Sequence, residues 1–194
     1  MLPPAVKTLA QDERSKALDI FTMAFVDDPV MRWLMPEGSV YLKNLGAAQE
    51  ALGGRALQHG SAHCLADASA AAFWLPPGVG PDEEAMVAFG SRVPPENVRA
   101  DTGGLMEQME KYHPQEPHWY LAALGVDVHR QGQGLGSILM KHALVRVDRE
   151  GKAAYLESSN PRNIPFYERH GFEVVGRIQA GSSPVITPML RRPR

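Results

Sequence analysis

A turn crowded with glycine, set between an apolar stretch and an amphipathic one, constrains the fold of this chain more than any other feature. Within LAALGVDVHRQGQGLGS, residues 121–137, Gly132, Gly134 and Gly136 alternate with larger residues. Glycine is used where the backbone takes a positive φ or approaches a ligand closely. The apolar residues that follow recur at helical spacing, so the segment predicts a strand, a tight turn and a helix.

The start of that predicted helix is a candidate anion site. Its first backbone N–H groups have no partners within the helix, and the helix dipole favours negative charge there. The dinucleotide fingerprint needs G-x-G-x-x-G, whereas the spacing here is G-x-G-x-G. A P-loop needs lysine before its Ser or Thr, but Gly136 is followed directly by Ser137. The turn is therefore another kind of phosphate site, or a plain connection between strand and helix.

Composition sets the broad class of the protein. The chain has 194 residues, with 20 basic and 22 acidic side chains, which excludes the strong positive charge typical of nucleic-acid binding. The single cysteine, Cys64, excludes an intrachain disulfide, and no run of 18 apolar residues or secretory signal pattern occurs. We expect one domain over residues 1–194, cytoplasmic, monomeric or homodimeric, with neither a nucleic acid nor a membrane as partner.

The residues around the glycine turn predict the centre of a sheet. A strand over residues 118–128 enters the turn, and an apolar strand over residues 153–159 follows the helix. Two strands joined through a helix read as parallel neighbours, and ligands bind at the carboxyl ends of such strands. Strict alternation predicts that one face of the first strand carries His118, Tyr120, Ala122, Leu124 and Val126.

A second motif follows the 153–159 strand. Asn160 is suited to cap a helix, Tyr167 lies seven residues later, and Gly171 is suited to end the helix before Phe172. A strand over residues 172–178 is then expected to pair antiparallel with residues 185–190. Upstream, residues 62–65 and 70–75 predict a β-hairpin.

The two motifs together resemble those of the GNAT superfamily of N-acetyltransferases. Gln131 to Gly136 match its acetyl-CoA loop, Gln/Arg-x-x-Gly-x-Gly/Ala, and Asn160, Tyr167, Gly171 and Phe172 match its Asn-x6-Tyr-x3-Gly-Phe signature. The resemblance covers residues 118–180, and AFVDDPVMRWL and FWLPPG upstream are similar to the branch of puromycin-type and other small-molecule acetyltransferases. It implies an α/β fold with a central mixed sheet of about seven strands, flanked by helices and splayed between the strand around Val126 and its parallel neighbour.

The resemblance also implies acetyl-CoA as cosubstrate. The amides of Gln131 to Ser137 would hold its diphosphate, and the backbone of Val126 and Val128 would pair with its pantetheine arm. Arg130 is a further phosphate contact or a solvated surface arginine. No metal is expected, since His59, His63 and Cys64 lack a fourth ligand at matching spacing. The expected cosubstrate-binding residues are Val126, Asp127, Val128, Arg130, Gln131, Gly132, Gln133, Gly134, Leu135, Gly136, Ser137, Asn160 and Tyr167.

The resemblance assigns Tyr167 the role of general acid toward the coenzyme thiolate. An ordinary tyrosine pKa of about 10 keeps the phenol protonated at neutral pH. The alternative is a core aromatic residue. The base is less defined, because the central strand carries no acid: the candidates are His118, Tyr120 and, on the next strand, Glu157. His118 titrates near neutrality, although a strand-end surface histidine would look the same.

The acceptor is expected near Asp27, Asp28 and Trp33, where a carboxylate would attract a cationic amine. The alternative is a helix cap and an ordinary helix corner, since Asp before a helix is a common cap. The sequence thus predicts an N-acetyltransferase that acts on a small primary amine. Acetylation of a protein N-terminus or lysine, and a non-catalytic acyl-CoA-binding module, are the alternatives.

Overall fold

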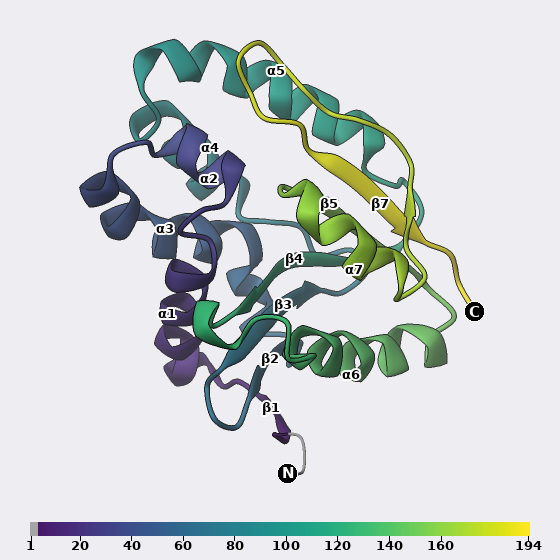
Figure 1. Ribbon diagram of the computed structural model, residues 1–194. Coiled ribbons are helices and arrows are strands. Elements are labelled where there is room, and N and C mark those ends of the chain that lie inside the picture. Colours follow the sequence, from purple (N-terminus) through teal and green to yellow (C-terminus); the bar gives the residue numbers. More distant parts are fainter. Residues whose placement is uncertain (1–3) are drawn as a thin grey trace.

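Seven strands form one sheet in the computed structural model, which describes residues 4–194 (Figure 1). Their order is β1-β2-β3-β4-β5-β7-β6, and the only parallel pair among the described strands is β4 with β5. This confirms the predicted mixed α/β sheet. The strands are β1 (Val6–Thr8), β2 (Ala62–Leu65), β3 (Ala70–Leu75), β4 (His118–Val126), β5 (Ala153–Ser158), β6 (Glu173–Val174) and β7 (Thr187–Arg191).

Helices cover both faces of this sheet. One face packs against α6 through residues such as Leu139 and Val147, and the other packs against α1 and α3 around Phe21. In the described chain no helix is long and apolar enough to cross a membrane. The helices are α1 (Arg14–Ala24), α2 (Pro29–Leu34), α3 (Gly38–Gly53), α4 (Glu83–Arg92), α5 (Glu96–Tyr112), α6 (Leu135–Arg149) and α7 (Ile164–Glu168).

Strands β4 and β5 are paired only where they begin. The register joins His118–Tyr120 to Ala153–Tyr155, and beyond Tyr120 the two strands part. On its other edge, β4 stays paired with β3 as far as Val126. The edge of β4 that faces β5 is therefore free of a strand partner over residues 121–126 in the described structure. This is the predicted splay, and it leaves a wedge at the carboxyl ends of both strands.

A β-bulge changes which residues of β4 face each layer of helices. Ala122 has no register partner, because the pairing with β3 steps from Leu121 to Ala123 across it. Tyr120 and Ala123 consequently pack with the α1 layer, whereas Leu121 and Leu124 pack with α6. Ala122 still packs on the side of Tyr120, but Leu124 and Val126 pack on the α6 side, so the alternation predicted for this strand is wrong beyond Ala122.

The ends of two strands also differ from the prediction. β4 ends at Val126, since Val128 begins a 3-10 helix. β6 is confined to Glu173–Val174, followed by an isolated bridge between Ile178 and Ile186, and β7 lies between β5 and β6. A Cβ at Gly176 would overlap the ring of Tyr112 in α5, so this ring packs directly against the backbone where the regular pairing of β6 stops.

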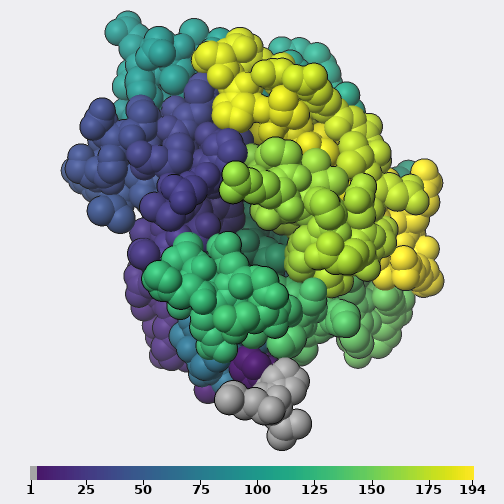
Figure 2. Space-filling view, in the orientation of Figure 1, coloured from purple at the N-terminus to yellow at the C-terminus, as the bar shows by residue number. Residues whose placement is uncertain are grey.

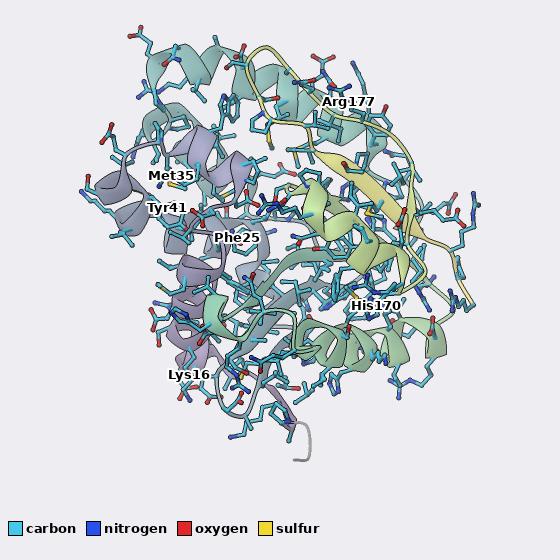
Figure 3. The ribbon with its side chains drawn as sticks, viewed as in Figure 1. Lys16, Phe25, Met35, Tyr41, His170 and Arg177 are labelled. Carbon is cyan, nitrogen blue, oxygen red and sulfur yellow. The ribbon has the colours of Figure 1, made fainter. Side chains whose placement is uncertain are left out.

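Helices α1, α2 and α3 pack together beside the wedge. Met35 and Tyr41 are almost completely buried, and Phe25 packs against them (Figure 3). The Tyr41 hydroxyl donates to the carbonyl of Thr22 at 2.7 Å. This cluster supports the short helix α2, which carries Trp33 and directly follows the other predicted acceptor residues, Asp27 and Asp28.

Candidate active site

The glycine turn follows β4 and leads into α6, as predicted. Gly132 and Gly134 have φ values of +75° and +81°, a backbone conformation that L side chains rarely adopt. An added Cβ at either position would meet nothing within 4 Å, so open space lies beside the turn. Figure 2 shows the surface hollowed between this turn, the amino-terminal helices and the segment around α7.

The first turn of α6 has no acidic side chain, and its N-cap residue, Gly134, contributes no side-chain acceptor. The helix is 15 residues long, so its dipole is fully developed at this end. Amides without an acceptor at a helix N-terminus suit a phosphate group. The turn residues Gln131, Gly132, Gln133 and Gly134 are exposed, whereas Leu135 and Gly136 are buried.

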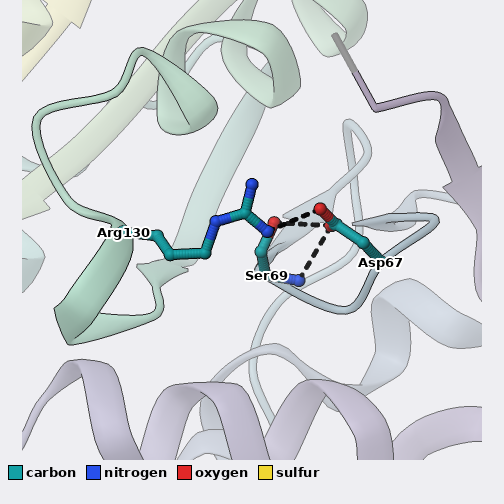
Figure 4. Close-up of polar contacts among 3 residues, drawn as sticks. All are labelled: Asp67, Ser69 and Arg130. Carbon is teal, nitrogen blue, oxygen red and sulfur yellow. Dashed lines mark hydrogen bonds and ion pairs between the residues drawn. The ribbon is translucent and has the colours of Figure 1, made fainter. Parts of the chain in front are cut away.

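An ion pair anchors the glycine turn to the β2–β3 hairpin (Figure 4). Arg130 Nη1 donates to Asp67 Oδ2 at 2.6 Å, and Asp67 Oδ1 accepts from the N and Oγ of Ser69 at 3.2 and 2.6 Å. The backbone N of Asp127 donates to the Ser69 carbonyl at 2.9 Å. Hydrogen bonds from Ser69 first, then from Arg130, lower the pKa of Asp67. Arg130, expected as a phosphate contact, is thus engaged by a carboxylate.

Tyr167 lies on α7, on the other side of the wedge. Its side chain is buried, and its ring packs edge-on against Phe166 and Phe172. Burial first and the Asp28 carboxylate second raise the pKa of the phenol, so it is protonated at neutral pH. Asn160 begins the same segment, and its Oδ1 accepts from the backbone N of Arg162 at 3.1 Å, which confirms it as a cap.

Asp28 caps α2, and its carboxylate is fully engaged by the chain. Oδ1 accepts from the backbone N of Val30 and of Met31, each at 3.0 Å, and Oδ2 accepts from Ser159 Oγ at 2.5 Å. The side chain is 6% exposed, and burial raises its pKa. The cap interpretation is confirmed, and a cationic amine would have to compete with three internal donors.

The other two acceptor candidates lie on either side of Asp28 along the chain. Asp27 is exposed just before α2. Trp33 points its indole N–H toward the carboxyl-terminal segment, where Nε1 donates to Ser182 Oγ at 3.1 Å. Ser182 in turn donates from N and Oγ to Asp101 of α5, at 2.8 and 2.7 Å. These contacts join α2, α5 and the segment before β7.

The three base candidates lie together with two residues that the sequence analysis did not identify, His113 and Tyr155. The rings of Tyr120 and Tyr155 stack with centroids 6.1 Å apart, and His113 lies edge-on to both. The Glu157 side chain is 6% exposed. Its Oε2 and the Tyr155 hydroxyl have no hydrogen-bond partner among the described residues. Buried polar atoms without partners are costly. After burial, the Glu157 carboxylate is what raises the pKa of both Tyr120 and Tyr155, so a slight movement of these phenols, a ligand or a water can complete the cluster.

His113 and His118 connect Glu157 to a surface cavity of about 270 Å³ that both line. His118 Nδ1 lies 2.8 Å from the carbonyl of Glu116, so neutral His118 carries its proton there. His118 Nε2 then accepts from His113 Nε2 at 3.1 Å, and His113 Nδ1 faces Glu157 Oε1 at 3.9 Å. Burial lowers the pKa of His118, which favours the neutral ring.

The predicted site residues therefore form three groups: the turn after β4, the Asp28–Tyr167 side of the wedge, and the Glu157 cluster. His113 follows a helix outside both motifs, and only its position five residues before His118 could have drawn attention to it. Across residues 4–194 no three His, Cys, Asp or Glu side chains are arranged to hold a metal ion.

Comparison with known proteins places the chain in a family. A family model described as Acetyltransferase (GNAT) family matches residues 49–172. A peptidyl-lysine N-acetyltransferase of Salmonella typhimurium is 31% identical over 71 residues, 37% of this chain and 48% of that protein, so the chain spans about half the length of this curated relative.

Solved structures share the whole fold. One described as histone acetyltransferase HPA2 and related acetyltransferase, from Corynebacterium glutamicum, is 25% identical with a TM-score of 0.70 and covers 100% of this chain and 98% of its own. A polyamine N-acetyltransferase of Drosophila melanogaster, 14% identical with a TM-score of 0.65, covers 97% and 99% and is similar in fold alone. With its family match over residues 49–172, the chain belongs to the acetyltransferase (GNAT) family.

Proposed function

We propose that this protein is an acetyl-CoA-dependent N-acetyltransferase that acetylates a primary amine of a small molecule. The observation that carries the proposal is the wedge between β4 and β5, with the glycine turn at the start of α6 on one side and a buried tyrosine, Tyr167, on the other. Acetyl-CoA supplies the thioester whose acetyl group is transferred.

Two backbone surfaces of the chain fit the cosubstrate. The unpaired edge of β4 over residues 121–126 can hydrogen-bond an extended pantetheine arm, in the manner of an added strand. The amides from Gln131 to Ser137 face a diphosphate at the end of α6. Asp127 stabilises the approach to the turn, because its Oδ1 accepts from the backbone N of His129 at 2.9 Å.

The reaction needs one proton removed and one supplied. The amine nitrogen bonds to the acetyl carbon while the carbon–sulfur bond breaks. Glu157 accepts the proton that the nitrogen loses, and Tyr167 gives its phenolic proton to the departing sulfur. A backbone N–H near Val126 polarises the acetyl carbonyl as charge develops on its oxygen.

Among the three base candidates we favour Glu157. Its unpartnered, buried Oε2 is the acceptor most in need of a donor, and the stacked rings of Tyr120 and Tyr155 adjoin it. His113 lies between Glu157 and His118, with Nδ1 3.9 Å from Glu157 Oε1 and Nε2 3.1 Å from His118 Nε2. This order of donors and acceptors can pass the proton toward the 270 Å³ cavity.

The acceptor side favours a small amine over a polypeptide. Helices α2 and α5 and the segment before β7 pack around Val30, Leu105, Ile178 and Ile186. Two hydrogen bonds join these elements, from Trp33 to Ser182 and from Gln108 to the Gln179 carbonyl, at 3.1 and 2.7 Å. We call α2, α5 and the segment before β7 the acceptor-side roof. The Drosophila neighbour, named as a polyamine acetyltransferase, agrees with this choice. The Salmonella and Corynebacterium proteins, named as lysine and histone acetyltransferases, keep a protein acceptor as the second candidate.

The test compares the wild-type protein with Tyr167→Phe and Glu157→Gln. Thiol release is measured against a panel of primary amines and lysine peptides, with acetyl-CoA affinity measured by calorimetry. We expect Tyr167→Phe to lower kcat by about 10²-fold or more, with acetyl-CoA affinity within about twofold. Unchanged turnover in Tyr167→Phe would remove it as the acid. Faster turnover of peptides than of free amines would favour the protein acceptor, and heat without any turnover would indicate a non-catalytic module.

A further inference from the structure

The hydrogen bond from Ser159 to Asp28 joins residues that are 131 positions apart in the chain. Ser159 directly follows β5, and Asp28 directly precedes α2. The Oγ–Oδ2 distance of 2.5 Å is that of a short, charge-assisted hydrogen bond. The bond thus links the start of α2 to the end of β5. The segment that follows β5 contains Asn160 and Tyr167.

We infer that Asp28 is a positioning residue that acts through Ser159: it fixes α2 and the acceptor-side roof against the end of β5. The inference rests on the proposed function, because the position of α2 affects turnover only if the acceptor amine binds beside it. It gives Asp28 a role different from capture of a cationic amine, for which its engaged oxygens are poorly placed.

A helix cap alone does not require this arrangement. Asp82 caps α4 with a single bond, from the backbone N of Ala85 to Oδ1 at 3.1 Å, and it is only partly buried. Asp28 satisfies its own cap with Oδ1, and its second oxygen is directed to another part of the chain. A carboxylate that is 6% exposed is costly unless its partners are well placed, so the bond to Ser159 helps to retain the charge at this position.

The length of α2 makes such a tie necessary. A helix of six residues is too short to be stable without tertiary contacts. Asp28 ties its amino-terminal end to β5, and Trp33 ties its other end to Ser182. Apolar packing around Val30 and Met35 holds the body of α2, and these two bonds fix its ends relative to the wedge. Small displacements of this kind lower rates strongly, because acyl transfer depends on alignment.

The buried charge also acts on the phenols around it. Next to the effect of burial, the Asp28 carboxylate raises the pKa of Tyr167 and of Tyr41. A negative charge near a phenol opposes its ionisation, so Tyr167 stays protonated until it transfers the proton to the leaving thiolate. The same carboxylate thus supports both the position of the acceptor wall and the protonation state of the proposed acid.

Three substitutions separate this role from plain stability. Ser159→Ala removes the tie and leaves the cap, Ser159→Thr keeps a hydroxyl, and Asp82→Asn changes a cap remote from the wedge. Hydrogen exchange of the peptide over residues 25–36 reports on α2 without any need for turnover. Kinetics with the best amine of the panel and calorimetry with acetyl-CoA give the functional readout.

In Ser159→Ala we expect α2 to exchange about fivefold faster or more, and kcat/KM for the amine to fall about tenfold, with acetyl-CoA affinity within about twofold. Ser159→Thr should restore both, and Asp82→Asn should change neither. Wild-type exchange in Ser159→Ala overturns the inference, and so does faster exchange with wild-type kinetics. If the wild-type protein binds acetyl-CoA but acetylates no amine, the proposed function fails, and unchanged exchange of α2 would still refute the tie separately.

Discussion

Replacing Asp67 by Asn tests how the glycine turn is held in place. The substitution keeps an oxygen for Ser69 N and Oγ, which both bond to Oδ1, and removes the charge that Arg130 meets at 2.6 Å. We expect acetyl-CoA to bind more weakly, because the turn loses part of its preorganisation. The opposite result has a clear meaning. If Arg130 binds a phosphate of acetyl-CoA directly, its release from Asp67 would strengthen acetyl-CoA binding.

The size of the effect follows from the exposure of the pair. Both side chains are 37% exposed, so their ion pair is partly screened by water. Pairs of this kind contribute about 0.2–1 kcal/mol, which corresponds to a change of roughly 1.4- to 5-fold in the dissociation constant. The main-chain bond from Asp127 to the Ser69 carbonyl, at 2.9 Å, remains in the variant and limits the loss.

The assay is calorimetric titration of acetyl-CoA into four proteins: wild type, Asp67→Asn, Arg130→Gln and the double variant. The double-mutant cycle isolates the coupling between the two side chains from their separate effects. The coupling should decrease when ionic strength rises from about 0.05 to 0.5 M, since exposed charges are screened. Tighter binding by Asp67→Asn, or a coupling energy of zero at low salt, would refute the anchoring role of this pair.

Four further substitutions test the fold and the turn. Gly134→Ala and Gly151→Ala both place alanine at a positive φ, +81° and +60°, so each should lose about 1–2 kcal/mol of stability in urea melts. Only Gly134→Ala should also weaken acetyl-CoA binding, and equal binding by both would contradict the assigned turn. Gly53→Ala puts a Cβ 2.9 Å from that of Phe73, and this overpacking should cost about 1–3 kcal/mol without altering acetyl-CoA affinity. Burial lowers the pKa of His63 to about 4. Between about pH 6.5 and 4 the His63 side chain is therefore protonated in the unfolded chain but not in the folded chain. Stability should therefore fall as pH drops from about 6.5 to 4, by up to about 1.4 kcal/mol per pH unit, and His63→Gln should flatten this slope in melts at several pH values.

The parts of the site that were predictable depend on local signals. The positive φ of Gly132 and Gly134 is a property that few other residues tolerate, and it lies within one turn of chain. Asn160 caps the segment that carries Tyr167 only seven residues later, so their spacing reports one local structure. The sheet followed from the same signals, because a strand–helix–strand unit fixes a parallel pair.

The parts that were missed depend on distant contacts. Ala122 bulges out of register with β3, and a Cβ at Gly53 of α3 would lie only 2.9 Å from its Cβ, so α3 packs tightly against the bulge. His113 reaches Glu157 from the end of a helix 44 positions earlier, and Asp28 meets Ser159 across an even longer separation. The spacing of residues in the sequence does not predict such pairs, because they form only when the helices pack against the sheet.

Between Leu121 and Val126, the edge of β4 that faces β5 has no strand partner among the described residues, and at its end the Val126 carbonyl accepts only from the Gln131 side chain, at 3.3 Å. Under the proposed function, acetyl-CoA forms the hydrogen bonds along this edge of β4 that a neighbouring strand would otherwise form. A donor at 100 times its dissociation constant would add about 2.7 kcal/mol to the stability of the folded chain. The lifetime of the enzyme would then rise and fall with the supply of the molecule that it consumes.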